Sequence, residues 1–147
     1  MALVVVHRLS GSRSRLRSRL QDASPELEEL RGRDPLTGLL TRAELEALLE
    51  PEVAQADHNQ GSLSLLYVGL DGLRAINEGY GMRVGDGLLV AVAERLQAFR
   101  GQAVPVCRVA GDEFVLVLRS GLSAAGPSAA ALLQALSQPF QVEALTL

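Results

Sequence analysis

The chain has 147 residues, of which 48% are hydrophobic and 3% aromatic, and its formal net charge is −3. This length suits one domain with its own core. The negative charge argues against a nucleic-acid binder, because affinity for phosphate backbones needs surplus Lys and Arg, and so few aromatic side chains argue against base stacking. A single cysteine, Cys107, excludes an internal disulfide and fits a reducing cytosol, so we expect a cytoplasmic protein.

Residues 1–33 differ in composition from the rest and predict an N-terminal linker that includes a connecting helix. A short apolar run opens the chain, and an Arg- and Ser-rich stretch over residues 8–20 precedes an acidic stretch at 25–30. The apolar run is too short to span a bilayer, which takes about 20 apolar residues, so no direct membrane insertion is expected. Its pattern also suits the last strand of a preceding sensor domain.

From residue 34 onward the hydrophobic pattern predicts helices and strands in turn. Thr41 and Glu44 have the spacing of a capping box before a helix that Pro51 is expected to bend or end. The other predicted elements are a buried strand over 62–70, a helix from about 85 that ends before 101, a hairpin of strands 104–110 and 114–118, a helix after 127, and the start of a strand over 140–147. This order predicts an α+β fold with a largely antiparallel central sheet flanked by helices.

The tip of the predicted hairpin reads Ala-Gly-Asp-Glu-Phe over residues 110–114 and is a candidate ligand site. Gly111 allows a close approach of the backbone to a ligand, and the carboxylates of Asp112 and Glu113 are oxygen ligands suited to Mg²⁺. The alternative is an ordinary hairpin, in which Asp112 shapes the turn and Glu113 is solvated.

A second polar segment follows the predicted buried strand, and strand ends next to loops are where sheets often place sites. It contains Asp71, Arg74 and Asn77, and Asp86 follows shortly after. The Asn77 amide both donates and accepts hydrogen bonds, which suits the edge of a purine, although nearby glycines also allow a simple turn role. Asp86 either accepts hydrogen bonds from a base or caps the next helix.

Three motifs in this order resemble those of GGDEF domains, the family of the diguanylate cyclases. They are Asp-Pro-Leu-Thr-Gly-Leu-Leu-Thr-Arg over residues 34–42, the segment 71–86 and the tip 110–114. The resemblance covers residues 34–147 and implies the nucleotidyl cyclase palm-like form of the α+β fold. Active members condense two GTP molecules into cyclic di-GMP across a homodimer, through metal-assisted attack of a ribose hydroxyl on an α-phosphate.

The resemblance also implies roles for individual residues. Asn77 and Asp86 match the pair that reads guanine, and Arg74 stands where the family usually has Lys near the phosphates. The nucleotide-binding candidates are Asn77, Asp86, Gly111 and Asp71, the metal-binding candidate is Asp112, and the catalytic candidates of an active member are Glu113 and Arg74.

Several departures from the family pattern predict a degenerate member. Gly69 stands where the family has a metal-binding Asp, so we expect Mg²⁺ binding to be weak or lost. Ala110 replaces the first glycine of the tip and adds a methyl group where the backbone should lie against the nucleotide, and Met82 replaces a histidine. The inhibitory product site, Arg-x-x-Asp, would fall on Gly101 and Val104 and is absent.

The resemblance further implies a longer chain. Family members continue beyond the strand that begins near Val142 into a helix with basic residues that hold the triphosphate, so residues 34–147 are expected to be truncated at the C-terminal end. The run over 138–142 resembles proteins in which an EAL phosphodiesterase domain follows. We therefore predict a non-catalytic GGDEF domain, with GTP as an allosteric ligand, that regulates a neighbouring sensor or EAL-type domain or another partner. The alternatives are an active diguanylate cyclase and a nucleotide-free dimerisation or docking scaffold.

Overall fold

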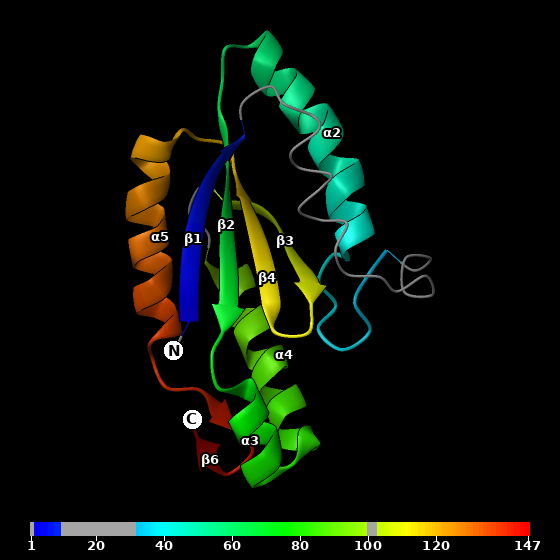
Figure 1. The fold of residues 1–147 in the computed structure, drawn as a ribbon, viewed down its shortest axis with the longest axis vertical. Coiled ribbons are helices and arrows are strands. Elements are labelled where there is room, and N and C mark those ends of the chain that lie inside the picture. The colour runs from blue at the N-terminus through cyan, green and yellow to red at the C-terminus, as the bar shows by residue number, and fades with distance from the viewer. Residues whose placement is uncertain (1, 10–31, 100–102) are drawn as a thin grey trace.

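The computed structural model describes residues 2–9, 32–99 and 103–147 (Figure 1). Its main sheet is antiparallel throughout and has the strand order β1-β2-β4-β3. The elements are β1 (Ala2–Leu9), α2 (Arg42–His58), β2 (Leu63–Leu70), α3 (Leu73–Tyr80), α4 (Met82–Ala98), β3 (Ala103–Ala110), β4 (Glu113–Leu118), α5 (Leu122–Leu136), β5 (Gln141–Val142) and β6 (Leu145–Thr146). The predicted α+β fold is therefore confirmed.

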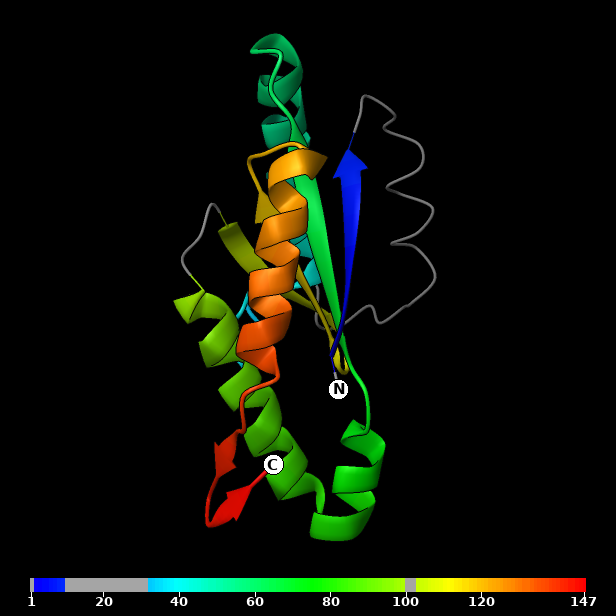
Figure 2. The same cartoon turned by 90° about the vertical axis from the view of Figure 1, so that its left-hand side faces the viewer.

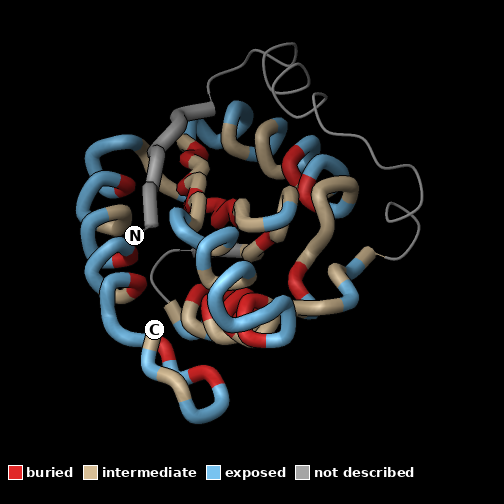
Figure 3. Tube along the Cα trace, turned by 60° about the horizontal axis from the view of Figure 1, so that its bottom comes forward, coloured by how far each residue is buried: buried red, intermediate tan, exposed pale blue. Residues whose placement is uncertain are grey.

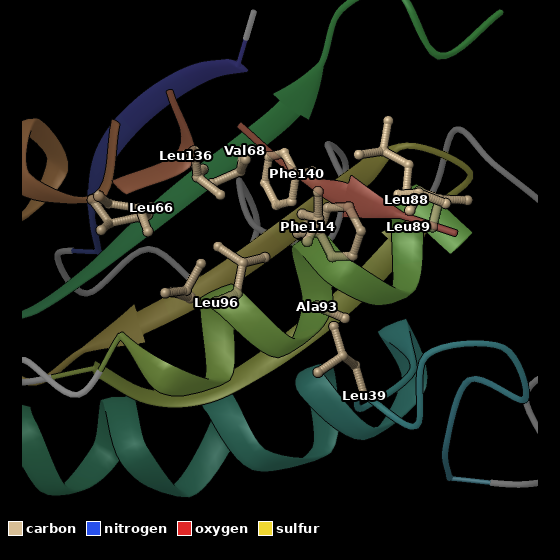
Figure 4. Packing of buried hydrophobic residues seen from close by; sticks show 14 of the residues in the cluster. Leu39, Leu66, Val68, Leu88, Leu89, Ala93, Leu96, Phe114, Leu136 and Phe140 are labelled. Atoms are coloured by element: carbon tan, nitrogen blue, oxygen red, sulfur yellow. The ribbon is translucent and has the colours of Figure 1, made fainter. Parts of the chain in front are cut away.

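The sheet separates two hydrophobic layers, because successive side chains of a strand point to opposite faces. The larger layer lies under α4 and α5, where Leu66 of β2 and Phe114 of β4 are fully buried. Figure 4 shows Phe114 in this layer near Phe140 and the leucines of α4. Each such side chain stabilises the fold by roughly 1.5–3 kcal/mol.

The smaller layer lies on the opposite face of the sheet, under α2. Leu45 and Leu49 of this helix pack against Cys107, Val115 and Val117, and all five side chains are buried. The tube in Figure 3 shows the buried positions of the helices turned inward toward the sheet. Cys107, the single cysteine of the chain, is thus a core residue.

Residues 2–9, which the composition assigns to a linker, form a strand of the main sheet. β1 pairs with β2 along its whole length, from Ala2 opposite Leu70 to Leu9 opposite Leu63 (Figure 2). The predicted linker helix lies outside the described residues, and the boundary at residue 33 stays a prediction. No helix in the described ranges is long and apolar enough to span a membrane.

The predicted starts of two helices are wrong, and of the two alternatives at Pro51 the helix does not end there. α4 begins at Met82, with Gly81 as its N-cap, and α5 begins at Leu122 and contains Pro127. α2 continues through Pro51 to His58, because residues beyond the proline still pack on the smaller layer. Tertiary packing of an apolar face thus outweighs the hydrogen bond that a proline removes.

The predicted capping box at the start of α2 does not form. Thr41 is the N-cap, and its carbonyl accepts a hydrogen bond from the Leu45 N–H at 3.0 Å. Its Oγ1 atom, however, is buried and has no partner among the described residues. The Glu44 carboxylate lies against Gly32, so that Oε1 is 3.2 Å from where a Cβ atom on Gly32 would stand.

Candidate functional site

The end of β2 and the tip of the β3–β4 hairpin lie side by side at one edge of the sheet (Figure 1). Gly69 is opposite Glu113 in the strand register. One residue further, the Leu70 N–H donates to the Asp112 carbonyl at 3.1 Å, and the exposed Asp71 follows directly. The fold thus brings together two of the polar segments that the sequence analysis singled out.

The guanidinium of Arg108 braces the hairpin tip. Its Nε and Nη2 atoms donate to the Gly111 carbonyl at 3.0 and 2.7 Å. Its Nη1 atom donates to the two carboxylate oxygens of Asp34 at 3.2 and 3.0 Å. Because both ion-paired side chains are only about 15% exposed, this contact ties the N-terminal motif firmly to the tip.

Asp34 is held in turn by the first residues of its own motif. Its Oδ2 atom accepts hydrogen bonds from the Thr37 N–H at 2.8 Å and from the Thr37 hydroxyl at 2.5 Å. Burial alone raises the pKa of Asp34, but the hydrogen bonds from Thr37 and the hydrogen bond and charge of Arg108 outweigh burial and lower the pKa. The carboxylate therefore stays ionised at neutral pH and holds Arg108.

Sequence reasoning missed Arg108 as a residue of this site. A signal was present, since Arg108 lies two residues before Ala110, at the start of the tip, and Asp34 with Thr37 has the spacing of a side-chain-bonded turn. The pairing of the two nevertheless joins positions 74 residues apart, which no local pattern reveals.

Glu113 does not extend freely into solvent, which was one alternative for this residue. It is half-buried and lies on the same face of the sheet as Tyr67. The residue opposite Tyr67 is Val115, two positions along β4 from Glu113. Burial, a hydrogen bond with the Glu113 side chain, and the charges of Glu113 and Asp112 raise the pKa of Tyr67. The phenol therefore remains protonated and donates to the Glu113 carboxylate.

The Mg²⁺ site that the resemblance implies would draw on side chains at this edge. Mg²⁺ bound with nucleotide is usually held by one or two carboxylates as well as phosphates, and position 69 supplies none. A Cβ atom on Gly69 would have no other heavy atom within 4 Å, so the space for a carboxylate is open. Within the described ranges, no three His, Cys, Asp or Glu residues are grouped so that they could hold a metal ion.

The segment after β2 is helical, although its glycines suggested a turn. Arg74 and Asn77 lie on α3, and Asp86 lies in the second turn of α4, so capping does not explain its identity. The Arg74 Nε atom pairs with Glu78 Oε1 at 2.8 Å, and both side chains are largely exposed. Arg74 thus forms an ion pair with a residue one turn further along the same helix.

The side-chain amide of Asn77 has an oxygen that accepts no hydrogen bond from the described residues. Its Oδ1 atom is buried without a hydrogen-bond partner in the described part of the chain, and it lies against Gly85 of α4. A buried acceptor without a donor costs about 1–3 kcal/mol, so its retention calls for an explanation such as a bound ligand or water.

A pocket of about 370 Å³ is lined by the end of β2, by α3 and α4, and by the end of α5 with the segment that follows it. Its wall is mainly apolar and includes Leu73, Ile76, Leu88 and Phe140, with Asp71 among the few polar residues. The structure thus places Asp71 beside a concave surface, next to the helices that carry Asn77 and Asp86.

Comparison with known proteins connects these motifs to one family. The family model described as "Diguanylate cyclase, GGDEF domain" matches residues 32–147. The chain is 37% identical over 140 residues to the bifunctional diguanylate cyclase/cyclic di-GMP phosphodiesterase MucR of Pseudomonas aeruginosa, which covers 95% of this chain and 20% of MucR. It is 38% identical over 117 residues to the diguanylate cyclase DgcP of the same organism, covering 76% of this chain and 17% of DgcP. The chain spans a fifth or less of the length of these relatives.

Solved structures show the same architecture. A sensory box/GGDEF family protein from Caulobacter crescentus has a TM-score of 0.73 and 31% identity, covering 79% of this chain and 76% of that one. The GGDEF domain of TpbB from Pseudomonas aeruginosa has a TM-score of 0.72 and 28% identity, covering 78% and 69%. The nucleotidyl cyclase palm-like fold that the resemblance implies is therefore confirmed.

Proposed function

Since this chain belongs to the GGDEF domain family of cyclic di-GMP signalling, we propose that it is a non-catalytic member that binds GTP and regulates a neighbouring domain or partner. Two of its relatives are diguanylate cyclases, and one of these, MucR, is also named a phosphodiesterase. A longer chain with sensor and EAL-type neighbours is therefore part of the proposal.

The main support for the loss of catalysis is the glycine that lies opposite Glu113. Gly69 faces Glu113 in the register at the end of β2, where the family has a metal-binding carboxylate. Without it, Asp112 is the one matched metal ligand, and the negative charge that develops on the phosphates is poorly neutralised. Ala110 adds a methyl group at the same tip.

The retained guanine-reading pair supports GTP as the ligand. Asn77 presents a buried, unpaired amide oxygen, and Asp86 lies on the neighbouring helix without a capping role. Amide and carboxylate groups together match the donors and acceptors on the edge of guanine. Binding of the base does not depend on the missing carboxylate, so recognition survives where turnover does not.

The test is calorimetric titration of the chain with GTP, with and without Mg²⁺, together with an assay for cyclic di-GMP. We expect GTP binding that Asn77→Ala weakens about tenfold or more, little dependence on Mg²⁺, and no product. The matched control is Asn59→Ala, an exposed amide beyond the end of α2. Clear production of cyclic di-GMP would overturn the non-catalytic assignment.

A gain-of-function variant tests the metal step separately. Because the space around a Cβ atom at Gly69 is open, Gly69→Asp should fold and should raise GTP affinity only when Mg²⁺ is present. The control Gly126→Asp adds the same charge on α5, where a Cβ atom is equally free of neighbours. Unchanged affinity in Gly69→Asp would point to a tip already distorted by Ala110.

The second candidate is an active diguanylate cyclase, favoured by the retention of Asp112 and Glu113 at the tip. It predicts metal-dependent turnover that Asp112→Ala abolishes. The absence of turnover at every Mg²⁺ and Mn²⁺ concentration would exclude it. Failure of GTP to bind at all would instead leave the docking scaffold, which needs no nucleotide.

A further inference from the structure

The contact between α3 and α4 depends on the absence of a side chain at Gly85. A Cβ atom built on Gly85 would lie 1.7 Å from Asn77 Oδ1 and 2.8 Å from Asn77 Cγ, whereas real Cβ atoms essentially never come within 3.0 Å of a heavy atom of a residue that is distant along the chain. The Asn77 amide therefore occupies the volume that any side chain at position 85 would fill.

The backbone of the turn between the helices places Asn77 over Gly85. The Gly81 N–H donates to the Asn77 carbonyl at 3.0 Å. The N–H groups of Val84 and Gly85 donate to the Gly81 carbonyl at 3.1 and 3.3 Å. With the turn closed in this way, the side chain of Asn77 lies on the first turns of α4, where Gly85 is buried.

A glycine inside a helix needs a structural reason, because it is less favourable there than alanine. Gly87, two residues further along α4, has a reason of its own, since a Cβ atom there would lie 2.6 Å from Val142 Cγ1. The two glycines thus make room for different neighbours. Only Gly85 makes room for a residue of the proposed nucleotide site.

We infer that Gly85 is a positioning residue of the nucleotide site: by lacking a side chain, it seats the Asn77 amide on the part of α4 that carries Asp86. This inference rests on the proposed function, since it takes Asn77 to read the base of GTP. Gly85 acts through Asn77, so any substitution at position 85 should displace the amide and weaken recognition of guanine.

The first test is a thermal stability cycle that needs no ligand. Gly85→Ala should lower Tm, because the new methyl group collides with Asn77. In the Asn77→Ala background the colliding atoms are gone, and apart from Gly85, its chain neighbours and the nearby backbone of α4, the other described heavy atoms are at least 3.4 Å from the added Cβ. There the same substitution should raise Tm by about 3 °C through better helix propensity.

The second test is GTP affinity, measured by titration calorimetry on the whole chain. Gly85→Ala should weaken GTP binding about tenfold or more, as Asn77→Ala does, through the lost hydrogen bonds to the base. The double variant should bind no more weakly than Asn77→Ala alone. Gly87→Ala is the matched control, because it crowds Val142 and should lower Tm without changing GTP affinity.

The two tests separate the inference from the proposed function. Equal Tm changes for Gly85→Ala in both backgrounds, or unaltered GTP affinity in a folded Gly85→Ala variant, would overturn the inference. If the unmodified chain binds no GTP, the proposed function fails and the nucleotide role of Gly85 fails with it. The reversal of the Tm effect would then still establish that Gly85 seats Asn77.

Discussion

Replacement of Asp34 by Asn should uncouple the hairpin tip from the N-terminal motif. The variant keeps the shape of the side chain and one carbonyl oxygen, so hydrogen bonding with Thr37 is partly retained. It removes the negative charge that faces the guanidinium of Arg108 at 3.0 Å. Arg108, which also holds the Gly111 carbonyl, is then left partly buried without a counter-charge.

The size of the effect follows from how far the pair is buried. Exposed ion pairs contribute about 0–1 kcal/mol, and breaking a fully buried pair costs about 3–5 kcal/mol. The side chains of Arg108 and Asp34 are 14% and 15% exposed, which lies nearer the buried limit. We therefore expect Asp34→Asn to lower the free energy of unfolding by about 2 kcal/mol, and Tm by about 6–8 °C for a chain of this length.

The pH dependence has a definite sign. The pKa of Asp34 is lowered in the folded chain, so its contribution is present above the ordinary carboxyl pKa of about 3.9 and is lost as the pH falls through the folded value. In urea titrations, the difference between wild type and Asp34→Asn should be constant from about pH 5 to 7 and shrink below about pH 4.

A double-mutant cycle with Arg108→Met completes the assay. The two losses should be less than additive, because either substitution breaks the same pair. Glu143→Gln is the control, since its pair with Arg83 is largely exposed and should change stability by less than about 0.5 kcal/mol. Additive losses, or a penalty for Asp34→Asn that is as large at pH 3 as at pH 6, would refute the reasoning.

Three further predictions concern the core and its edges. Arg95→Met removes donors to three backbone carbonyls at and just beyond the end of α5, and it removes the contact of the guanidinium with the Phe140 ring, 3.4 Å from the ring centroid. Urea titration should therefore show a loss of about 2 kcal/mol in the free energy of unfolding, which Arg95→Lys should not avoid. Leu66→Ala, at a fully buried position, should cost about 2–5 kcal/mol in the same assay, whereas Leu133→Ala, at a position 39% exposed, should stay within about 0.5 kcal/mol. Burial raises the pKa of Cys107 to about 12, so a thiol reagent at pH 8 should label the folded chain far more slowly than the chain in denaturant, and equal rates would contradict this burial.

Strong hydrophobic patterns predicted much of the sheet. The nearly unbroken apolar run over 62–70 became β2, and the two runs around Gly111 became the β3–β4 hairpin, within a residue or two of the expected ends. β2 and β4 carry buried side chains on both faces, so their sequences are apolar at nearly every position. The motifs in this part of the chain also identified the family before any contact was known.

Local patterns failed where a distant contact overrides them. The glycines around Asn77 suggested a turn, yet α3 forms there and packs on α4. Apolar residues 2–9 suggested a separate segment, yet they complete the sheet beside β2.

By itself, the sequence determined the order of the main strands and helices and the family of the domain, because these depend on periodicity and on motifs within short windows. Only the tertiary structure decided that Arg108 bonds Asp34, that Tyr67 holds Glu113, and that Asn77 lies where Gly85 has no side chain. These contacts join separate elements and depend on which surfaces meet when the two layers pack. The spacing of residues along the chain does not show which of these surfaces will come into contact.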